Sequence, residues 1–180
     1  EAIRLFSKKT RFYQASTSEM YGLNERNQKK LNEKSHFNPI SPYSIAKLSA
    51  YHNVRMYRNS FNIFASNGIL FNHESPLRGD QFVTKKIVKD LTEIKFNKKK
   101  DTLKLGNIYS RRDWGHARDY VDMMYKIMTH KKADDFVISS EKQFSIKEFI
   151  NLVCKKLNMQ IKWHGKGLKE KAIYNKKVII

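Results

Sequence analysis

Cysteine and long apolar stretches are the first things this sequence lacks. Cys154 is its single cysteine among 180 residues, so an internal disulfide is excluded and a reducing compartment is expected. No apolar run approaches the ~20 residues that a membrane-spanning helix needs. The charged start, residues 1–12, does not read as a secretory signal. We therefore expect a cytoplasmic protein that does not enter a membrane.

Glycine is scarce as well, and its placement is informative. The seven glycines form neither a GxGxxG nor a GxxGxxG turn, the motif that holds a pyrophosphate at the start of dinucleotide-binding folds. Gly165 and Gly167 follow a late, edge-like strand and do not qualify. The first residue is not Met, and residues 1–6 read as the end of a helix. We expect a fragment of a longer protein.

Acidic residues are few relative to basic ones. Lys and Arg number 36 against 17 Asp and Glu, which gives a formal net charge of +19. Such a balance fits either a nucleic-acid or anionic-surface partner, or lysines that are simply solvated. The lysine runs 98–100, 131–132 and 176–177 lie between expected elements, without the aromatic pattern of RNA-binding folds. We favour solvated lysines and expect no specific nucleic-acid partner.

The six histidines are scattered, and none has a partner at metal-ligand spacing. Structural zinc sites need several Cys or His ligands close together in a characteristic spacing. We expect no metal.

Hydrophobic periodicity predicts strands that alternate with helices. Ser41 and Pro42 open a helix to about residue 60, and Ser145 with Glu148 forms a capping box for a helix to about Leu157. Further helices are expected at 82–94 and 117–129, strands at 11–16, 63–71, 102–105, 135–139, 160–163 and 178–180, and loops at 22–40, 72–80 and 106–116. The alternation predicts an α/β fold with parallel pairing, and the glycine within 63–71 marks a close approach.

Thr17, Tyr43 and Lys47 form the first constellation with chemical meaning. Tyr43 and Lys47 are four residues apart on an expected helix, so both point from one face. An ammonium beside a phenol favours the phenolate, and a phenolate can take a proton from a sugar hydroxyl. Thr17 ends an expected strand, where open α/β sheets place their sites. Taken alone, the pair is a weak signal, and two ordinary exposed helical residues are the favoured interpretation.

Four segments in order narrow the interpretation: QASTSEMYG (14–22), SPYSIAK (41–47), NGILFNHESP (67–76) and LGNIYSRRDWGHARDY (105–120). Together they resemble the extended short-chain dehydrogenase/reductase family and, within it, the GDP-mannose 4,6-dehydratases. The resemblance covers nearly all of residues 1–175. It implies part of a Rossmann-type, doubly wound parallel sheet plus a small α/β substrate domain.

The resemblance also implies a reaction, a cofactor and a substrate. GDP-mannose would become GDP-4-keto-6-deoxymannose, on the route to GDP-fucose, through internal hydride transfer by NADP and loss of water. Tyr43, helped by Thr17, would be the base at the C4 hydroxyl. Lys47 would hold the nicotinamide ribose, and Glu19 would remove the C5 proton. Without the resemblance, Glu19 reads as a loop carboxylate that accepts backbone N–H bonds.

Five further residues match binding positions of the family. His73 and Arg78 match cofactor contacts, although a buried histidine and a surface arginine are the plain alternatives. Asn72, Lys86 and Arg112 match positions that hold the GDP-sugar, and an arginine fork suits a diphosphate. Lys86 reads equally well as an ordinary exposed helical lysine.

The resemblance further implies domain boundaries and an oligomer. Residues 1–76 would be the C-terminal part of the NADP-binding domain, with the glycine motif upstream. Residues 77–180 would be mainly the substrate domain, crossing back to the Rossmann sheet and truncated at its end. A homo-oligomer is expected of the full-length protein. Another sugar-nucleotide dehydratase or epimerase, or a basic binding module without catalysis, stays open as an alternative; Glu19 favours a dehydratase.

Overall fold

The computed structural model describes residues 1–22, 30–98 and 102–180, and the chain divides into two compact units. The first unit comprises residues 1–73 and 114–141, and the second comprises residues 74–113 and 142–180. The chain therefore leaves the first unit, returns to it, and leaves it again before its end.

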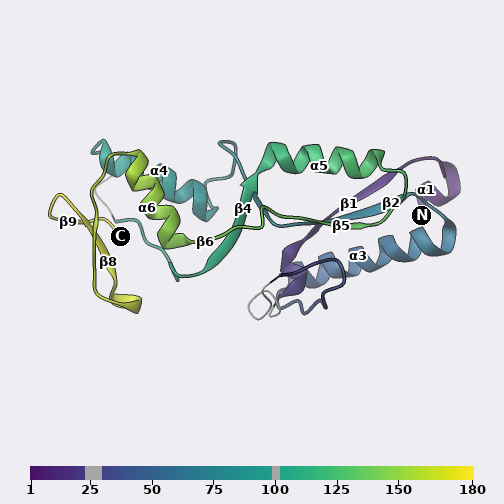
Figure 1. Cartoon of the computed structure of the whole chain (residues 1–180), viewed down its shortest axis with the longest axis horizontal. Coiled ribbons are helices and arrows are strands. Elements are labelled where there is room, and N and C mark those ends of the chain that lie inside the picture. Colours follow the sequence, from purple (N-terminus) through teal and green to yellow (C-terminus); the bar gives the residue numbers. More distant parts are fainter. Residues whose placement is uncertain (23–29, 99–101) are drawn as a thin grey trace. The chain divides into compact units, whose positions relative to one another are not determined.

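The first unit is a parallel sheet with a helix on each face. Its sheet has the order β1-β2-β5, and both pairings are parallel. Helix α3 packs on β1 and β2 from one side, and α5 packs on all three strands from the other (Figure 1). The elements are α1 (Ala2–Phe6), β1 (Phe12–Thr17), η1 (Ser18–Tyr21), α3 (Pro42–Phe61), β2 (Ala65–Leu70), α5 (Ala117–Thr129) and β5 (Asp135–Ile138). This arrangement confirms the predicted α/β, Rossmann-type class.

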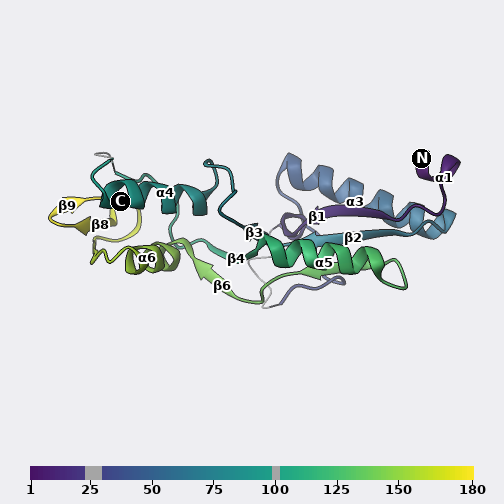
Figure 2. The same cartoon turned by 90° about the horizontal axis from the view of Figure 1, so that it is seen from above.

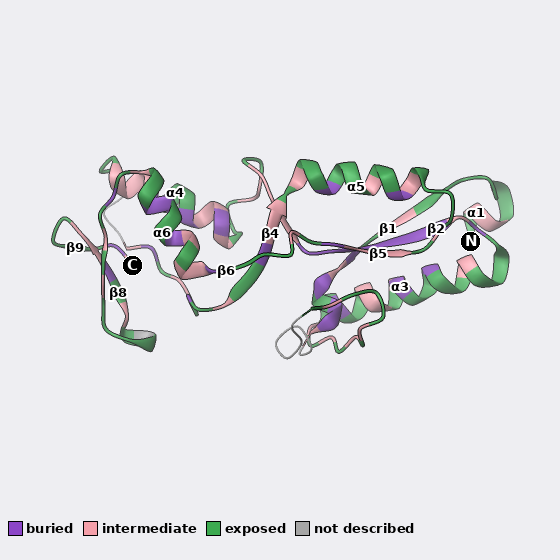
Figure 3. Cartoon of the chain, in the orientation of Figure 1, coloured by how far each residue is buried: buried purple, intermediate pink, exposed green. Residues whose placement is uncertain are grey.

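The central strand explains why this sheet forms. All six residues of β2 are buried (Figure 3), as expected of a parallel strand covered on both faces. Helix α3 begins where the sequence predicts. The Ser41 hydroxyl accepts a hydrogen bond from the Ser44 amide, and the Ser44 hydroxyl accepts one from the Ser41 amide. It ends at Asn62, which adopts a left-handed conformation with φ of 51°, as is common after a helix.

The second unit is built on a pair of helices and a small antiparallel sheet. Helices α4 and α6 contact each other (Figure 2), and buried Ile87, Leu91, Ile150 and Cys154 belong to one core with Ala172 of β8. The sheet has the order β7-β8-β9. The elements of this part, with the connecting strands β3 and β4, are β3 (Asn72–Glu74), α4 (Val83–Lys95), β4 (Arg111–His116), β6 (Gln143–Ser145), α6 (Ile146–Lys156), β7 (Lys162–His164), η2 (Gly167–Lys169), β8 (Lys171–Tyr174) and β9 (Lys177–Val178).

The predicted capping box of α6 is confirmed. The Glu148 amide donates to the Ser145 hydroxyl at 3.1 Å, and the Ser145 amide donates to the Glu148 carboxylate at 2.5 Å. Two backbone N–H groups that lack helical partners are thereby satisfied. These bonds, with the Arg111 guanidinium 3.3 Å from the same carboxylate, hold the pKa of Glu148 below its ordinary value.

Several predicted boundaries are wrong. Residues 72–74 form β3 inside an expected loop, and residues 111–116 form β4 where a loop was expected. The expected strand at 102–105 does not form: Leu103 is buried in extended coil, and its amide donates to the Ile179 carbonyl. The last expected strands are shifted to 162–164 and 177–178, and β8 was missed. Short polar strands such as RRDWGH lack the alternation that identifies a strand.

The segment expected to be a loop, 22–40, has no helix or strand in its described residues, 22 and 30–40; residues 23–29 lie outside the described part. It nevertheless contributes to the fold, because Leu31 and Phe37 pack against buried Met20, Tyr21 and Tyr51. The Glu33 carboxylate accepts a hydrogen bond from the Val137 amide on β5 at 2.7 Å. The loop residue Glu33 thus satisfies a backbone N–H donor on the edge of β5 that faces away from β2.

Gly68 confirms the predicted close approach inside β2. A Cβ at this position would lie 1.9 Å from the Tyr13 hydroxyl. We expect Gly68→Ala to lower the free energy of unfolding, measured by urea denaturation, by about 1–3 kcal/mol. This is the usual cost of overpacking. Combining it with Tyr13→Val should recover part of the loss, since the clash is with that ring. A double variant that is destabilised by the full sum of the two single effects would contradict this contact.

Candidate active site

The candidate catalytic residues lie at the carboxyl ends of the parallel strands. Thr17 is the last residue of β1, Glu19 lies in the η1 turn that follows, and Asn72 comes shortly after β2. Open α/β sheets place their ligands at this edge because side chains from several strand ends converge there. Thr17 is paired with Leu70, so the two strand ends are in register.

Thr17 and Glu19 are positioned by the backbone of η1. The Thr17 hydroxyl oxygen accepts from the Glu19 amide at 3.3 Å, which caps the turn. Met20 and Tyr21 are fully buried and anchor it, whereas Glu19 is exposed. The turn therefore fixes the backbone of Glu19 and leaves its carboxylate in solvent, where a substrate proton is accessible.

Tyr43 and Lys47 share one face of α3, as their spacing predicts. The Lys47 ammonium lies 5.7 Å from the centre of the Tyr43 ring. It donates to the Ala15 carbonyl at 2.8 Å, so an interaction with β1 fixes a flexible side chain. The Tyr43 side chain is 52% exposed, and its phenol is accessible to a ligand. Helix α3 also contacts η1, which brings the Tyr43 helix and the Glu19 turn together.

Two other tyrosines of this unit, Tyr13 and Tyr51, have raised pKa values. Burial raises the pKa of Tyr13 to about 12. Burial, followed by the hydrogen bond to the Asp135 carboxylate, raises the pKa of Tyr51 to about 12. Both phenols are therefore held protonated at neutral pH and are unsuited to act as a base.

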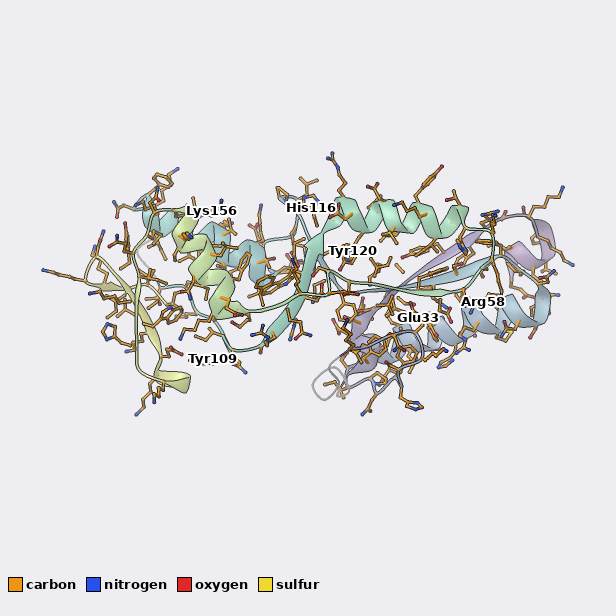
Figure 4. The ribbon with its side chains drawn as sticks, in the orientation of Figure 1. Glu33, Arg58, Tyr109, His116, Tyr120 and Lys156 are labelled. Carbon is orange, nitrogen blue, oxygen red and sulfur yellow. The ribbon has the colours of Figure 1, made fainter. Side chains whose placement is uncertain are left out.

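His73 has a defined orientation that the sequence did not predict. Its Nδ1 lies 3.0 Å from the Phe71 carbonyl oxygen. Because a carbonyl only accepts, Nδ1 carries the proton and Nε2 of the neutral ring is an acceptor. The ring stacks on Tyr120 of α5, with centroids 4.8 Å apart and planes 27° from parallel (Figure 4 labels Tyr120). His73 is thus a held, half-buried side chain.

Tyr120 and Gly115 are the site-supporting residues that sequence reasoning missed. A Cβ at Gly115 would lie 2.4 Å from the Tyr120 ring, so only glycine leaves that ring its place against His73. The His116 Nδ1 accepts from the Arg118 amide at 3.2 Å and caps α5. The signal was present in RDWGHARDY, where the glycine precedes the tyrosine by five residues, but periodicity indicated only an apolar helix face.

Arg78, Lys86 and Arg112 belong to the second unit, each with its own surroundings. The Arg78 Nε is 3.4 Å from the Glu74 carboxylate, and its guanidinium lies 3.5 Å over the Phe82 ring. The Lys86 ammonium donates to the Lys104 carbonyl at 2.8 Å, which is more order than an ordinary exposed lysine shows. Arg112 is exposed, and its Nη1 donates to the Arg111 carbonyl at 2.7 Å.

Within the described residues there is neither a metal-ligand cluster nor a membrane-spanning helix. No group of three or more His, Cys, Asp or Glu side chains in this part of the chain is placed to hold a metal ion. No helix in residues 1–22, 30–98 and 102–180 has the length and apolar character to cross a membrane.

Comparison with solved structures identifies the fold. RMD from Pseudomonas aeruginosa, complexed with NADPH, superposes with a TM-score of 0.77 at 22% identity, covering 82% of this chain and 51% of the other. A dTDP-glucose 4,6-dehydratase from Bacillus anthracis, in complex with NAD, gives 0.74 at 21% identity, covering 82% and 46%. The chain therefore shares its Rossmann-type α/β fold with these two proteins.

Sequence comparison identifies the family. The model for GDP-mannose 4,6 dehydratase matches residues 1–179. A GDP-mannose 4,6-dehydratase of Vibrio cholerae is 47% identical over 175 residues, 96% of this chain. GDP-mannose 4,6 dehydratase 2 of Caenorhabditis elegans is 47% identical over 165 residues, 91% of this chain. The chain belongs to the GDP-mannose 4,6 dehydratase family. It spans less than half the length of these two relatives, 46% and 42% respectively.

Proposed function

We propose that this chain carries the catalytic residues of an NADP-dependent GDP-mannose 4,6-dehydratase. The observation that carries the proposal is the Tyr43–Lys47 pair, with Lys47 bound to the end of β1 and Glu19 exposed in the next turn. Family membership supplies the substrate class. On the basis of family membership, residues 1–76 would be part of the NADP-binding domain, and residues 77–180 would be mainly the substrate domain.

The residues present fit the nicotinamide end of a dinucleotide. Lys47 offers an ammonium that suits ribose hydroxyls, and His73 offers an Nε2 acceptor beside the carboxyl end of β2. Arg78 suits a phosphate in its charge and planar shape. When bound, NADP would accept a hydride from C4 of the mannose and return it at C6. The glycine-rich pyrophosphate turn is not among these 180 residues.

The chain's own residues would handle the protons. The Tyr43 phenolate takes the proton of the C4 hydroxyl, assisted by the Thr17 hydroxyl, and a 4-ketone results. That ketone acidifies the C5 hydrogen, which the Glu19 carboxylate removes as a proton. The protonated Glu19 then donates this proton to the C6 hydroxyl, which leaves as water, and C5 takes a proton from solvent when the hydride returns to C6. Asn72, Lys86 and Arg112 would hold the GDP-sugar, with Arg112 suited to the diphosphate. We also propose a cytoplasmic location, with which the free thiol of buried Cys154 agrees, and a homo-oligomer for the full-length protein, as the resemblance implies.

A chimera tests this function. This chain would replace the segment of the Vibrio cholerae relative that it matches, and the chimera would be incubated with GDP-mannose and NADP. We expect GDP-4-keto-6-deoxymannose, identified by NMR. The unmodified relative is the positive control. A folded chimera that binds GDP-mannose and yields only an epimer, or no product, would overturn the proposal.

A further inference from the structure

A cavity lies in the first unit, away from the candidate active site. It has a volume of about 570 Å³ and is lined by the end of α3, the turn into β2 and the loop between α5 and β5. These segments precede β2 and β5, so the cavity is at the amino ends of the strands. Thr17 and Asn72 lie at the opposite, carboxyl ends.

Basic side chains outnumber acidic ones around this cavity. Four cations face two carboxylates: Arg55, Arg58, Lys131 and Lys132 against Asp134 and Asp135. The last turn of α3 adds a partial negative charge of roughly half a unit. That partial charge is too small to cancel the surplus of about two positive charges. The cavity therefore has a positive potential that attracts anions.

The negative charge at the bottom of the cavity is already neutralised. The Asp135 carboxylate accepts from Arg58 at 3.0 Å, from Asn67 at 2.8 Å and from Tyr51 at 2.9 Å. The Arg55 Nε is 3.5 Å away from it. One buried carboxylate thus faces two guanidinium groups, and a positive charge is left over.

The cations differ in how firmly they are held. Arg58, on α3 (Figure 4), is 14% exposed and also donates to the Ala65 carbonyl at 2.9 Å, so its fork is fixed before any ligand arrives. Lys131 and Lys132 are exposed, and within the described residues neither ammonium has an ion pair or a hydrogen bond. The fixed guanidinium of Arg58, together with the exposed ammonium groups of Lys131 and Lys132, suits a ligand with several phosphate oxygens.

We propose that this cavity binds a diphosphate group, either free or as part of a nucleotide. Its volume falls within the range of small-molecule sites, roughly 300–1,000 Å³. Asn59 and Asn62 add neutral amide donors to the lining. Asp134 opposes binding at the rim, so its neutralisation should strengthen the site.

Titration calorimetry on the 180-residue chain tests the proposal, with inorganic pyrophosphate in one arm and adenosine diphosphate in the other. Lys131→Ala/Lys132→Ala should weaken pyrophosphate binding about tenfold, because two exposed ion pairs are lost and each contributes modestly. Asp134→Asn should strengthen it, and added salt should weaken it. Equal affinities for pyrophosphate and adenosine diphosphate would show that the cavity recognises only the diphosphate group. Tighter binding of adenosine diphosphate would show that it is a nucleotide site.

Lys155→Ala/Lys156→Ala is the matched control, because this exposed lysine pair lies at the end of α6, outside the cavity. A second measurement needs no variant. Chemical acetylation of lysines in the unmodified chain is measured by mass spectrometry, and pyrophosphate should slow the acetylation of Lys131 and Lys132 but not that of Lys155 and Lys156. Equal loss of binding in both double variants, uniform protection, or affinity weaker than about 10 mM in the unmodified chain would overturn the proposal.

Discussion

Replacing Tyr43 by Phe in the chimera should reduce formation of the 4-keto-6-deoxy product by about 10²–10⁴-fold, the usual worth of a positioned general base. The change removes only the phenol oxygen, and Lys47 keeps its bond to the Ala15 carbonyl. In the proposed reaction, oxidation at C4 is the first step, so every later step stops with it. Neither the ketone at C4 nor exchange of the C5 hydrogen with deuterated solvent should be detected.

Tyr125→Phe is the control for this variant. Tyr125 lies on α5 in the same unit and is 70% exposed, so loss of its hydroxyl should leave the rate unchanged. Near-native product formation by Tyr43→Phe would remove Tyr43 from the reaction. Equal losses in both variants would point to general damage to the unit.

Glu19→Gln should separate the two proton transfers. The base at C4 is intact, so the 4-ketone still forms, and a borodeuteride quench should place deuterium at C4. Exchange at C5 and product formation should fall by about 10²–10⁴-fold, because Gln cannot accept the C5 proton. Glu141→Gln, an exposed change in the same unit, is the control. Native exchange at C5 in Glu19→Gln would argue against dehydration through this residue.

The helices and the buried strand could be predicted because their signals are local. Ser41 with Pro42, and Ser145 with Glu148, identify helix starts through hydrogen bonds made within four residues. Strand β2 lies in the centre of its sheet, and apolar residues at both ends of the segment 63–71 indicate a buried strand although Ser66 and Asn67 lie within it. Such elements need no knowledge of distant residues.

The short strands could not be predicted, because distant partners define them. Strand β4 pairs with β6, so that Arg112 lies opposite Phe144, and neither strand has an apolar run of its own. Leu103 shows the converse: it is buried like a strand residue, yet the segment around it forms no strand. Strand pairing depends on the register between segments that are distant in the sequence. The periodicity of one segment carries no information about that register.

The candidate site divides in the same way. The Tyr43–Lys47 pair follows from helical spacing alone, and the geometry on α3 agrees with it. The anchoring of Lys47 on Ala15, and the stack of His73 on Tyr120, join residues 32 and 47 positions apart, which no local pattern predicts. The roles of these residues in catalysis stay predictions that the variants above address.

Asp135→Asn should be the most destabilising conservative change in the first unit. The carboxylate is 9% exposed and holds α3 to the sheet through Arg58, Tyr51 and Asn67. Its loss leaves the largely buried Arg58 cation without its charge partner. Breaking a buried pair in this way costs about 3–5 kcal/mol, so we expect a loss near 3 kcal/mol because the cavity admits water to Arg58. Urea unfolding followed by circular dichroism measures it.

Asp134→Asn is the adjacent control: this carboxylate is exposed, and an amide oxygen can still accept from the Asp135 amide. Its effect should stay within about 0.5 kcal/mol. Matching losses at the two positions would contradict a special role for Asp135.

The pH dependence of unfolding gives an independent measure of the same carboxylate. Burial alone would raise the pKa of Asp135, but hydrogen bonds from Arg58, Asn67 and Tyr51 outweigh it and hold the pKa below its ordinary value. The carboxylate's contribution is therefore fully present above the unfolded-state pKa of about 3.9. It is lost as pH falls through the lower folded-state value. Between neutral pH and strongly acidic pH, the free energy of unfolding of the unmodified chain should converge on that of Asp135→Asn, because protonation removes the charge that the substitution removes. A constant gap between the two chains across this range would mean that the negative charge of Asp135 does not stabilise the unit.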